Sequence, residues 1–503
     1  MSRKWFSACR VAAVVSVAGV VFALGPPSFA AQSTPALPSS IVEIENALRA
    51  RAFDRAIELS QSAVAAHPDD YRVWTLRGMA YAGAGKVKQA DAAYQQALQL
   101  RPDFLPALEG AAQAEFQNGS KNTEDLLRRV LAVRPGDATA NVMLAMTLYK
   151  RADCKAATTY FERARPLVDQ RLLPLSEYGV CLSRLGRGEE AVGVFQSAAA
   201  LAPQDRGARY NFALALMDAK RYDDALKALA PDIGAGSTDE NALTLAADIA
   251  EASNDTPQAV ALLRQAIVAR PLEDDAYLRF ATLSSNHKSF RVGIDMLNSG
   301  LARMPKSAQL YLARGALYAQ LGNYDKAMDD FATANHLDPR LSFAGTAEGI
   351  TEAQRHDFVG SLAKFRQQVR QHPDNAYDHY LLAETLAQRG SDLGSPEYEE
   401  ELRAAKNAVR LDPSLTVARG LLANLYLRSG KTELAVEQCE AALKTDPENQ
   451  EALYRLILAL RKTSRRGEIP SLTKRLLALR NAQKEKEMRT TRFQLVDSAS
   501  GGR

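Results

Sequence analysis

Apolar residues recur at intervals of three and four positions along most of this 503-residue chain, and polar residues fill the positions between them. The stretch 310–339, LYLARGALYAQLGNYDKAMDDFATANHLDP, shows this pattern clearly. Its apolar spacing predicts two amphipathic helices, because strands would alternate with a period of two. Gly322 fits a left-handed turn between the helices, and Pro339 ends the second helix because proline cannot continue one.

This helix–turn–helix unit repeats with a period of 34 residues. The prolines that end successive units are separated by 34, 33, 68, 68, 34, 34, 34, 40 and 34 residues. Each step of 68 is two periods in which one proline is absent, and the step of 40 indicates a six-residue insertion around 390–396. These prolines are Pro68, Pro102, Pro135, Pro203, Pro271, Pro305, Pro339, Pro373, Pro413 and Pro447.

The same residue types return at the same places inside each unit. Two units illustrate the agreement: Trp74, Gly78, Tyr81, Gly85, Ala90, Tyr94, Ala97 and Pro102; and Tyr311, Gly315, Tyr318, Gly322, Ala327, Phe331, Ala334 and Pro339. The pattern resembles the tetratricopeptide repeat, W-x2-L-G-x2-Y followed by A-x3-F and P within 34 residues. Small residues let the two helices approach closely, and the aromatic side chains fill the gap between them.

The resemblance implies an all-α fold, a right-handed tetratricopeptide-repeat superhelix (α-solenoid) of about twelve helix pairs. No pair can bury its apolar face alone, so neighbouring pairs must stack. We expect this array at 40–454, basic capping helices at 455–490 and a disordered tail at 491–503. The units at 104–137 and 206–239 depart most from the repeat pattern.

The first thirty residues predict an export signal, followed by a linker at 31–39. Arg3, Lys4 and Arg10 form a positive segment, an uncharged apolar run follows at 11–24, and small residues predict cleavage after Ala30. An uncleaved anchor is the alternative, but a helix of this length reaches only ~21 Å, short of the ~30 Å apolar core of a bilayer. We therefore expect an exported protein, periplasmic or secreted, whose secretion route stays open.

The net charge of +4 is distributed unevenly. Residues 455–503 hold thirteen Lys and Arg against four Asp and Glu, a net charge of +9, whereas residues 31–454 carry a net charge of −8. The basic C-terminus is either a solvated helical face or a surface that contacts an anionic partner. Since the chain after residue 30 is nearly neutral overall, its charge gives no case for a nucleic-acid partner.

We find no sequence motif for catalysis, for a cofactor or for a metal ion. The chain lacks GxSxG, HExxH, GxGxxG and P-loop motifs, and none of its cysteines forms a CxxC pair. His356, His372 and His379 are close in sequence, but they fall on different predicted helices of consecutive repeats. We therefore expect a protein that is not an enzyme and that binds no cofactor.

Cys154 and Cys181 are candidates for a disulfide. Cys154 lies near the start of one unit's second helix, and Cys181 lies near the end of the next unit's first helix. These helices should run antiparallel in contact, so the two Cα atoms could come within the ~4.4–6.8 Å that a disulfide requires. Two buried thiols are the alternative. Cys439 occupies an aromatic packing position and is expected to be buried and unreactive.

In repeats of this kind the first helix of each unit lines the concave side of the superhelix. The resemblance therefore implies a peptide-binding groove, whose apolar, methionine-rich part lies in the N-terminal half of the chain. The alternative is that these side chains pack between helices. The candidate groove residues are Met79, Leu105, Leu108, Val142, Met146, Tyr149, Val180, Tyr210, Leu214 and Met217.

The corresponding positions in the C-terminal half are more polar and include Asp248, Glu251, Tyr377, Tyr380, Glu384 and Asn424. Cochaperone domains of this family clamp an acidic C-terminal carboxylate with Lys and Asn on their first helices. Here Asn424 stands alone, with Gly420 at the place of a Lys, so the resemblance does not extend to that activity.

Three functions remain open on the sequence. The first is a non-enzymatic exported scaffold that mediates protein–protein interactions through its groove. The second is an accessory subunit of an envelope polysaccharide or secretion assembly, because similar arrays accompany such machinery. The third is an enzyme whose site the sequence does not reveal. The oligomeric state is not predicted.

Overall fold

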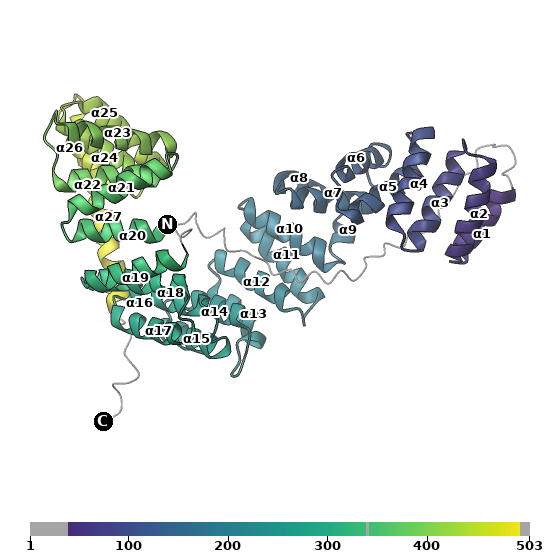
Figure 1. The fold of residues 1–503 in the computed structure, drawn as a ribbon, viewed down its shortest axis with the longest axis horizontal. Helices are drawn as coiled ribbons and strands as arrows, with labels where there is room; N and C mark the ends of the chain where they lie inside the picture. The colour runs from purple at the N-terminus through teal and green to yellow at the C-terminus, as the bar shows by residue number, and fades with distance from the viewer. Residues whose placement is uncertain (1–38, 339–341, 493–503) are drawn as a thin grey trace. The chain divides into compact units, whose positions relative to one another are not determined.

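The computed structural model describes residues 39–338 and 342–492, and these residues form α-helices and short 3₁₀ turns with no strand (Figure 1). The expected signal peptide, almost all of the linker at 31–39 and the tail from residue 493 lie outside the described residues. Within the described ranges no helix is both long enough and apolar enough to cross a bilayer.

The chain divides into two compact units, with the boundary between Lys220 and Arg221. The helices of the first unit are α1 (Ser39–Arg49), α2 (Phe53–Ala66), α3 (Tyr71–Gly83), α4 (Val87–Leu100), α5 (Leu105–Asn118), α6 (Thr123–Val133), α7 (Ala138–Lys150), α8 (Cys154–Arg163), α9 (Arg165–Val168), α10 (Leu172–Arg184), α11 (Gly188–Leu201) and α12 (Arg206–Asp218).

The second unit contains fifteen α-helices and two 3₁₀ turns among its described residues. They are α13 (Tyr222–Leu229), η2 (Ala230–Asp232), α14 (Glu240–Ala252), α15 (Thr256–Ala269), α16 (Asp275–Asn286), α17 (Phe290–Arg303), α18 (Ala308–Gln320), α19 (Tyr324–Leu337), α20 (Ser342–Gln354), α21 (Phe358–Gln371), α22 (Ala376–Arg389), α23 (Pro396–Leu411), α24 (Thr416–Arg428), α25 (Thr432–Thr445), α26 (Gln450–Leu460), η3 (Arg466–Glu468) and α27 (Ile469–Arg492).

Successive helices within each unit form hairpins that stack on one another. In the first unit α3 packs against its partner α4 and also against α5, the first helix of the next pair. In the second unit α24 packs in the same way against α25 and α26. The predicted all-α repeat architecture is therefore confirmed.

The division between the units falls within the degenerate repeat at 206–239, where the sequence predicted a continuous array. The second helix of this repeat, α13, has eight residues and buries only Ala225 and Leu229, whereas the second helices before and after it, α11 and α15, have fourteen. The turn η2 and a loop that includes Gly234 and Gly236 follow it. This helix therefore buries fewer apolar residues than the corresponding helices α11 and α15.

The last pair, α26 and α27, ends the second unit. The expected end of the repeats at residue 454 falls inside α26, which packs against α25 as the first helix of a further pair. Leu472 and Ile469 at the start of α27 pack against a buried cluster of Leu453, Ile457 and Leu476. The basic C-terminal segment is therefore attached to the repeats through apolar side chains.

Glycines on first helices make room for aromatic rings on second helices. A Cβ atom on Gly78 would lie 2.5 Å from the ring of Tyr94, and one on Gly110 of the next repeat would lie 2.3 Å from the same ring. The Tyr94 side chain is 1% exposed, so its ring fills the space between the two glycines. The same contact recurs between Gly315 and Phe331, at 2.7 Å.

The turn inside each hairpin uses the left-handed backbone region. Glycine occupies it in several repeats, for example Gly85 with φ of 73° and Gly322 with φ of 74°. Other repeats place a residue with a side chain there, for example Ala152 with φ of 62° and Lys288 with φ of 54°. Tertiary packing therefore imposes the turn even where the residue disfavours it.

Cys154 on α8 and Cys181 on α10 form a disulfide with a Cα–Cα distance of 4.9 Å. It links the second helix of one pair to the first helix of the next, across a contact between α8 and α10. The bond lies between consecutive repeats, so it restrains the stacking of pairs as well as the chain between them. Cys439 is buried as a free thiol, and burial raises its pKa to about 12.

We expect Gly78→Ala to lower the free energy of unfolding by ~1–3 kcal/mol, because the added methyl group meets a buried ring that has no space to move into. Gly193→Ala is the matched control. Gly193 lies in helix α11, and a Cβ atom there meets nothing within 4 Å. Because alanine favours a helix over glycine, this control should gain ~0.5–1 kcal/mol. Urea unfolding of both variants tests the prediction, and shifts of the same sign would contradict it.

Reduction of the disulfide should lower the free energy of unfolding by ~3–4 kcal/mol, because the bond closes a loop with a sequence separation of 27. Denaturation with and without a reductant measures this difference. The double variant Cys154→Ser with Cys181→Ser should be less stable and should no longer respond to the reductant. Equal stability of the natural chain in both conditions would refute the prediction.

Candidate peptide-binding surface

All ten candidate groove residues lie on the first helices of their pairs. Met79 is on α3, and Leu105 and Leu108 are on α5. The remaining seven are Val142, Met146 and Tyr149 on α7, Val180 on α10, and Tyr210, Leu214 and Met217 on α12.

Three of these residues are buried. The side chains of Leu108, Val142 and Met146 are 1%, 0% and 7% exposed. They lie on α5 and α7, and α7 packs against both α5 and α10. These three side chains therefore belong to the packing between first helices. Such packing was the alternative to a binding groove that the sequence left open for each candidate.

The other seven residues are half-buried. Met79 packs in part against the buried cluster formed by the first two pairs. The guanidinium of Arg184 lies 5.6 Å from the centre of the Tyr149 ring. Four of the half-buried residues lie on the adjacent helices α10 and α12, and we name them the α10–α12 stripe. It consists of Val180, Tyr210, Leu214 and Met217.

A buried carboxyl group lies one turn before Val180 on α10. Glu177 is 8% exposed, and its Oε2 atom has no hydrogen-bond partner among the described residues. Burial raises the pKa of Glu177 to about 7, against the opposing attraction of Lys150. Glu177 was not among the candidates predicted from the sequence, although an acid within the apolar run LLPLSEYGV was a signal. A neighbouring N–H group could satisfy the free oxygen.

On the first helices α14 and α16 of the second unit, polar side chains form hydrogen bonds and ion pairs with one another. Arg279 on α16 donates a hydrogen bond to Asp248 on α14 and another, of 2.7 Å, to Asp275. Nε2 of His287 lies 2.9 Å from Oε1 of Glu251. Asp248 and Glu251 are therefore engaged within the protein.

Aromatic and charged side chains gather further along the second unit, on α22 and α26. The rings of Tyr377 and Tyr380 lie 5.7 Å apart, centre to centre. Nη1 of Arg455 lies 2.8 Å from the place that a Cβ atom on Gly420 would occupy, so the missing side chain makes room for the guanidinium. Burial raises the pKa of Tyr380, Glu384 and Glu451 add to the shift, and Arg455 opposes it. Tyr380 was among the groove positions named from the sequence, whereas Arg455 was not.

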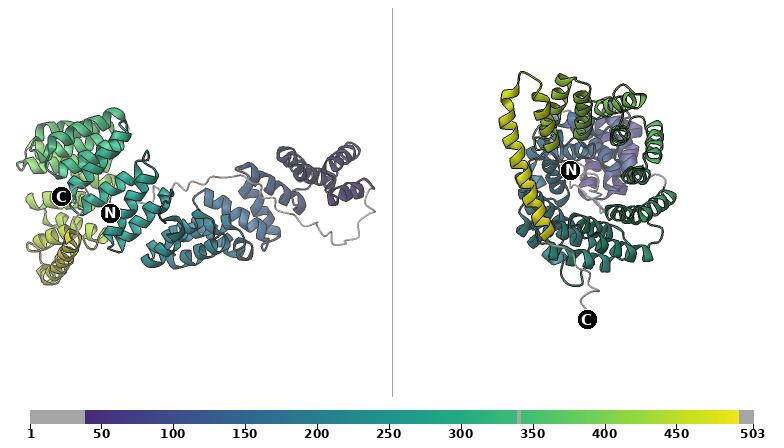
Figure 2. Two further views of the ribbon diagram at one scale, coloured as in Figure 1. Left: turned by 90° about the horizontal axis from the view of Figure 1, so that it is seen from below. Right: turned by 90° about the vertical axis from the view of Figure 1, so that its left-hand side faces the viewer.

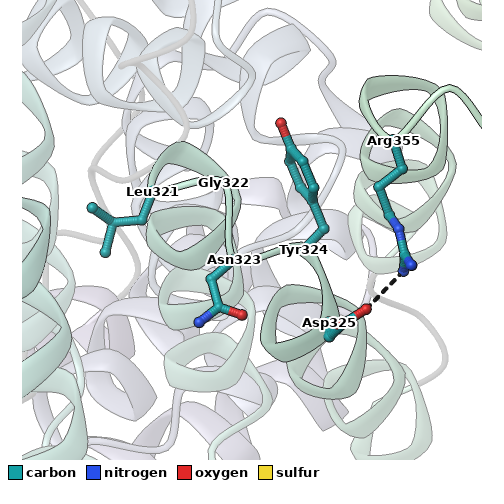
Figure 3. Close-up of a pocket in the computed structure, with 6 residues that line it drawn as sticks. All are labelled: Leu321, Gly322, Asn323, Tyr324, Asp325 and Arg355. Carbon is teal, nitrogen blue, oxygen red and sulfur yellow. Dashed lines mark ion pairs between the residues drawn. The ribbon is translucent and has the colours of Figure 1, made fainter.

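Figure 3 shows an open hollow at the turn between α18 and α19. Its side chains point in different directions, and Arg355 forms an ion pair of 3.0 Å with Asp325. The hollow follows from the shape of the inter-helix turn and gathers no set of reactive groups. No group of three or more His, Cys, Asp or Glu residues suited to a metal ion occurs within 39–338 and 342–492.

Comparison with known proteins finds one family. Models of the tetratricopeptide repeat match residues 71–104, 182–249, 308–340 and 421–466. These matches fall in both compact units.

Three curated relatives share 22–24% identity with the chain. The BBSome complex member BBS4 homolog of Drosophila melanogaster is 22% identical over 61% of this chain and 57% of that protein. Cellulose synthase operon protein C of Komagataeibacter xylinus is 24% identical over 68% of this chain and 22% of that protein. The Hsp70-Hsp90 organizing protein of Triticum aestivum is 23% identical over 34% of this chain and 27% of that protein. The chain spans less than two thirds of the length of each.

Two solved structures are similar over most of their length. Yeast Tom70 is 18% identical, with a TM-score of 0.44 over 90% of this chain and 94% of that one. Cut9-Hcn1 of the APC/C is 12% identical, with a TM-score of 0.36 over 83% of this chain and 95% of that one. The 34-residue period, the stacked helix pairs and the four family matches together establish that the chain is a tetratricopeptide repeat protein.

Proposed function

We propose that this protein is an exported, non-enzymatic scaffold that holds protein segments on the first helices of its repeats. The observation that carries the proposal is the α10–α12 stripe, in which Tyr210, Leu214 and Met217 on α12 and Val180 on α10 remain partly exposed. Such side chains adapt to varied apolar partners. Two of the relatives, the BBSome complex member homolog and the Hsp70-Hsp90 organizing protein, are named for protein assemblies, which supports a role of this kind.

Export is supported by two features of the chain. The positive segment, the apolar run and the small residues before Ala31 form a signal-peptide pattern. The disulfide between Cys154 and Cys181 suits an oxidising compartment, such as the periplasm or the outside of the cell.

We also propose that the protein is not an enzyme, because repeat helices take up nearly all of its described residues. Helices of the repeats occupy the ranges 39–338 and 342–492 and leave no separate domain within them.

A second candidate is an accessory subunit of an envelope polysaccharide or secretion assembly. The observation that favours it is the match to cellulose synthase operon protein C over 68% of this chain. The match covers 22% of that protein, so it concerns only a part of it. Recovery of a glycosyltransferase or a glycan with the purified protein would favour this candidate over a general peptide scaffold.

The double variant Leu214→Glu with Met217→Glu tests the stripe. Both residues keep part of their surface accessible, and a carboxylate at either position opposes the burial of an apolar partner there. We expect at least about a tenfold loss of the proteins recovered from envelope extract, measured by quantitative mass spectrometry.

The matched control is Val133→Glu with Leu201→Glu, two exposed apolar residues on the second helices α6 and α11. The control should recover the same proteins as the natural chain, and circular dichroism should show that both variants remain helical. Equal recovery by all three proteins would contradict the proposal. Met146 is unsuitable for this test because its side chain belongs to the core.

A further inference from the structure

The C-terminal end of the second unit presents cations that have no partner in the described part of the chain. Arg465 forms ion pairs of 2.8 Å with Glu440 and 2.7 Å with Glu468. Six exposed cations of the same region have no ion pair or side-chain hydrogen bond to any residue within 39–338 and 342–492. They are Arg461, Lys462, Arg466, Lys474, Arg480 and Lys484.

The helix α27 has two different long faces. One face packs against α26, with Leu472, Leu476 and Leu479 at spacings of four and three residues. The opposite face carries Lys474, Leu477, Asn481, Lys484 and Met488, again at spacings of three and four residues. Figure 2 shows α27, in yellow, as one long helix at the edge of the second unit.

Apolar side chains lie among the cations on this outer face. Leu477 is 53% exposed and Met488 is 64% exposed. Arg480 flanks the face between Leu477 and Lys484, and Glu485 borders it with the opposite charge. From Lys474 to Met488 the face extends for ~21 Å along the helix.

We propose that this outer face of α27 binds the surface of an anionic phospholipid bilayer. Lipid headgroups attract lysine and arginine near the surface, and the boundary between headgroups and acyl chains accepts side chains such as leucine and methionine. A soluble polyanion would use the cations and leave the two apolar side chains in water. The alternation of cations with exposed apolar residues therefore favours lipid over a soluble polyanion. This surface is separate from the α10–α12 stripe.

Vesicle co-sedimentation of the full chain tests the proposal. The probes are vesicles of phosphatidylglycerol mixed with phosphatidylcholine, and vesicles of phosphatidylcholine alone. Binding to the neutral vesicles measures any contribution of the apolar N-terminal segment. We expect stronger binding to the anionic vesicles, and we expect added salt to weaken it.

The variant Lys474→Gln, Arg480→Gln and Lys484→Gln should bind anionic vesicles roughly ten- to a hundredfold more weakly than the natural chain. Its matched control is Lys88→Gln, Lys121→Gln and Lys155→Gln. This control removes three exposed lysines of the first unit, so the net charge falls equally. The control should bind as the natural chain does. An equal loss in both variants, or no loss in the α27 variant, would overturn the proposal.

Leu477→Ser separates a bilayer from a soluble polyanion. It should weaken binding to anionic vesicles several-fold and leave binding to heparin unchanged, because heparin does not take up apolar side chains. If Leu477→Ser binds vesicles as the natural chain does while the α27 charge variant loses both ligands, the surface recognises polyanions in general and the lipid assignment is wrong. The changed side chains are exposed, so both variants should keep the helical content of the natural chain.

Discussion

The contact between a first-helix glycine and a second-helix aromatic ring sets the spacing of the repeats. The Tyr94 ring lies against Gly78 of its own repeat and Gly110 of the next, so a single side chain fixes both the hairpin and the stacking of hairpins. Gly179 with Phe195 and Gly349 with Phe365 repeat the contact within the hairpin. Because each ring needs space on a neighbouring helix, a helix pair is a complete packing unit only beside another pair.

This constraint also decides which side chains remain for function. First helices in the middle of the first unit have neighbours on both sides, so Val142 on α7 is 0% exposed. By contrast, α12 is the last helix of its unit and has no later helix of that unit against it. Its residues Tyr210, Leu214 and Met217 keep part of their surface. Val180 on α10 also keeps part of its surface although α10 has helices on both sides, so the place of a residue on its helix matters as well as the place of the helix in the stack.

The period and the fold class were predictable because they depend on many copies of a local signal. The conformation of individual turns was less predictable. The left-handed conformation expected for glycine is also adopted by Ala152, Lys220 and His356. Packing of the two helices imposes that conformation, and the local sequence does not reveal it. The division after Lys220 was also missed, because it reflects the small surface that α13 buries.

The candidate surface was predicted only in part, because exposure changes from one helix position to the next. Leu108 is 1% exposed, whereas Glu109 beside it is half-exposed and forms an ion pair of 2.9 Å with Arg134. A repeat pattern predicts which residue of a helix faces the groove with an error of about one position. Because neighbouring residues point in different directions, that error is enough to confuse a packed side chain with an accessible one. Arg455 was missed for a related reason, because its guanidinium occupies space left by Gly420 on another helix.

The net charge of the chain indicates a binding surface only after the charges that pair within the protein are set aside. Arg314 is 20% exposed and joins Asp330 on the following helix at 2.7 Å, and Lys364 on α21 joins Glu348 on α20 at 2.6 Å. Such pairs join the two helices of a hairpin and leave little charge for a partner. Lys474, Arg480 and Lys484 on α27 form no such pair with any residue of the described ranges, although Glu485 borders their face, and α27 packs against α26 with its opposite face. A charge imbalance that is modest for the whole chain is thus concentrated where the repeats end.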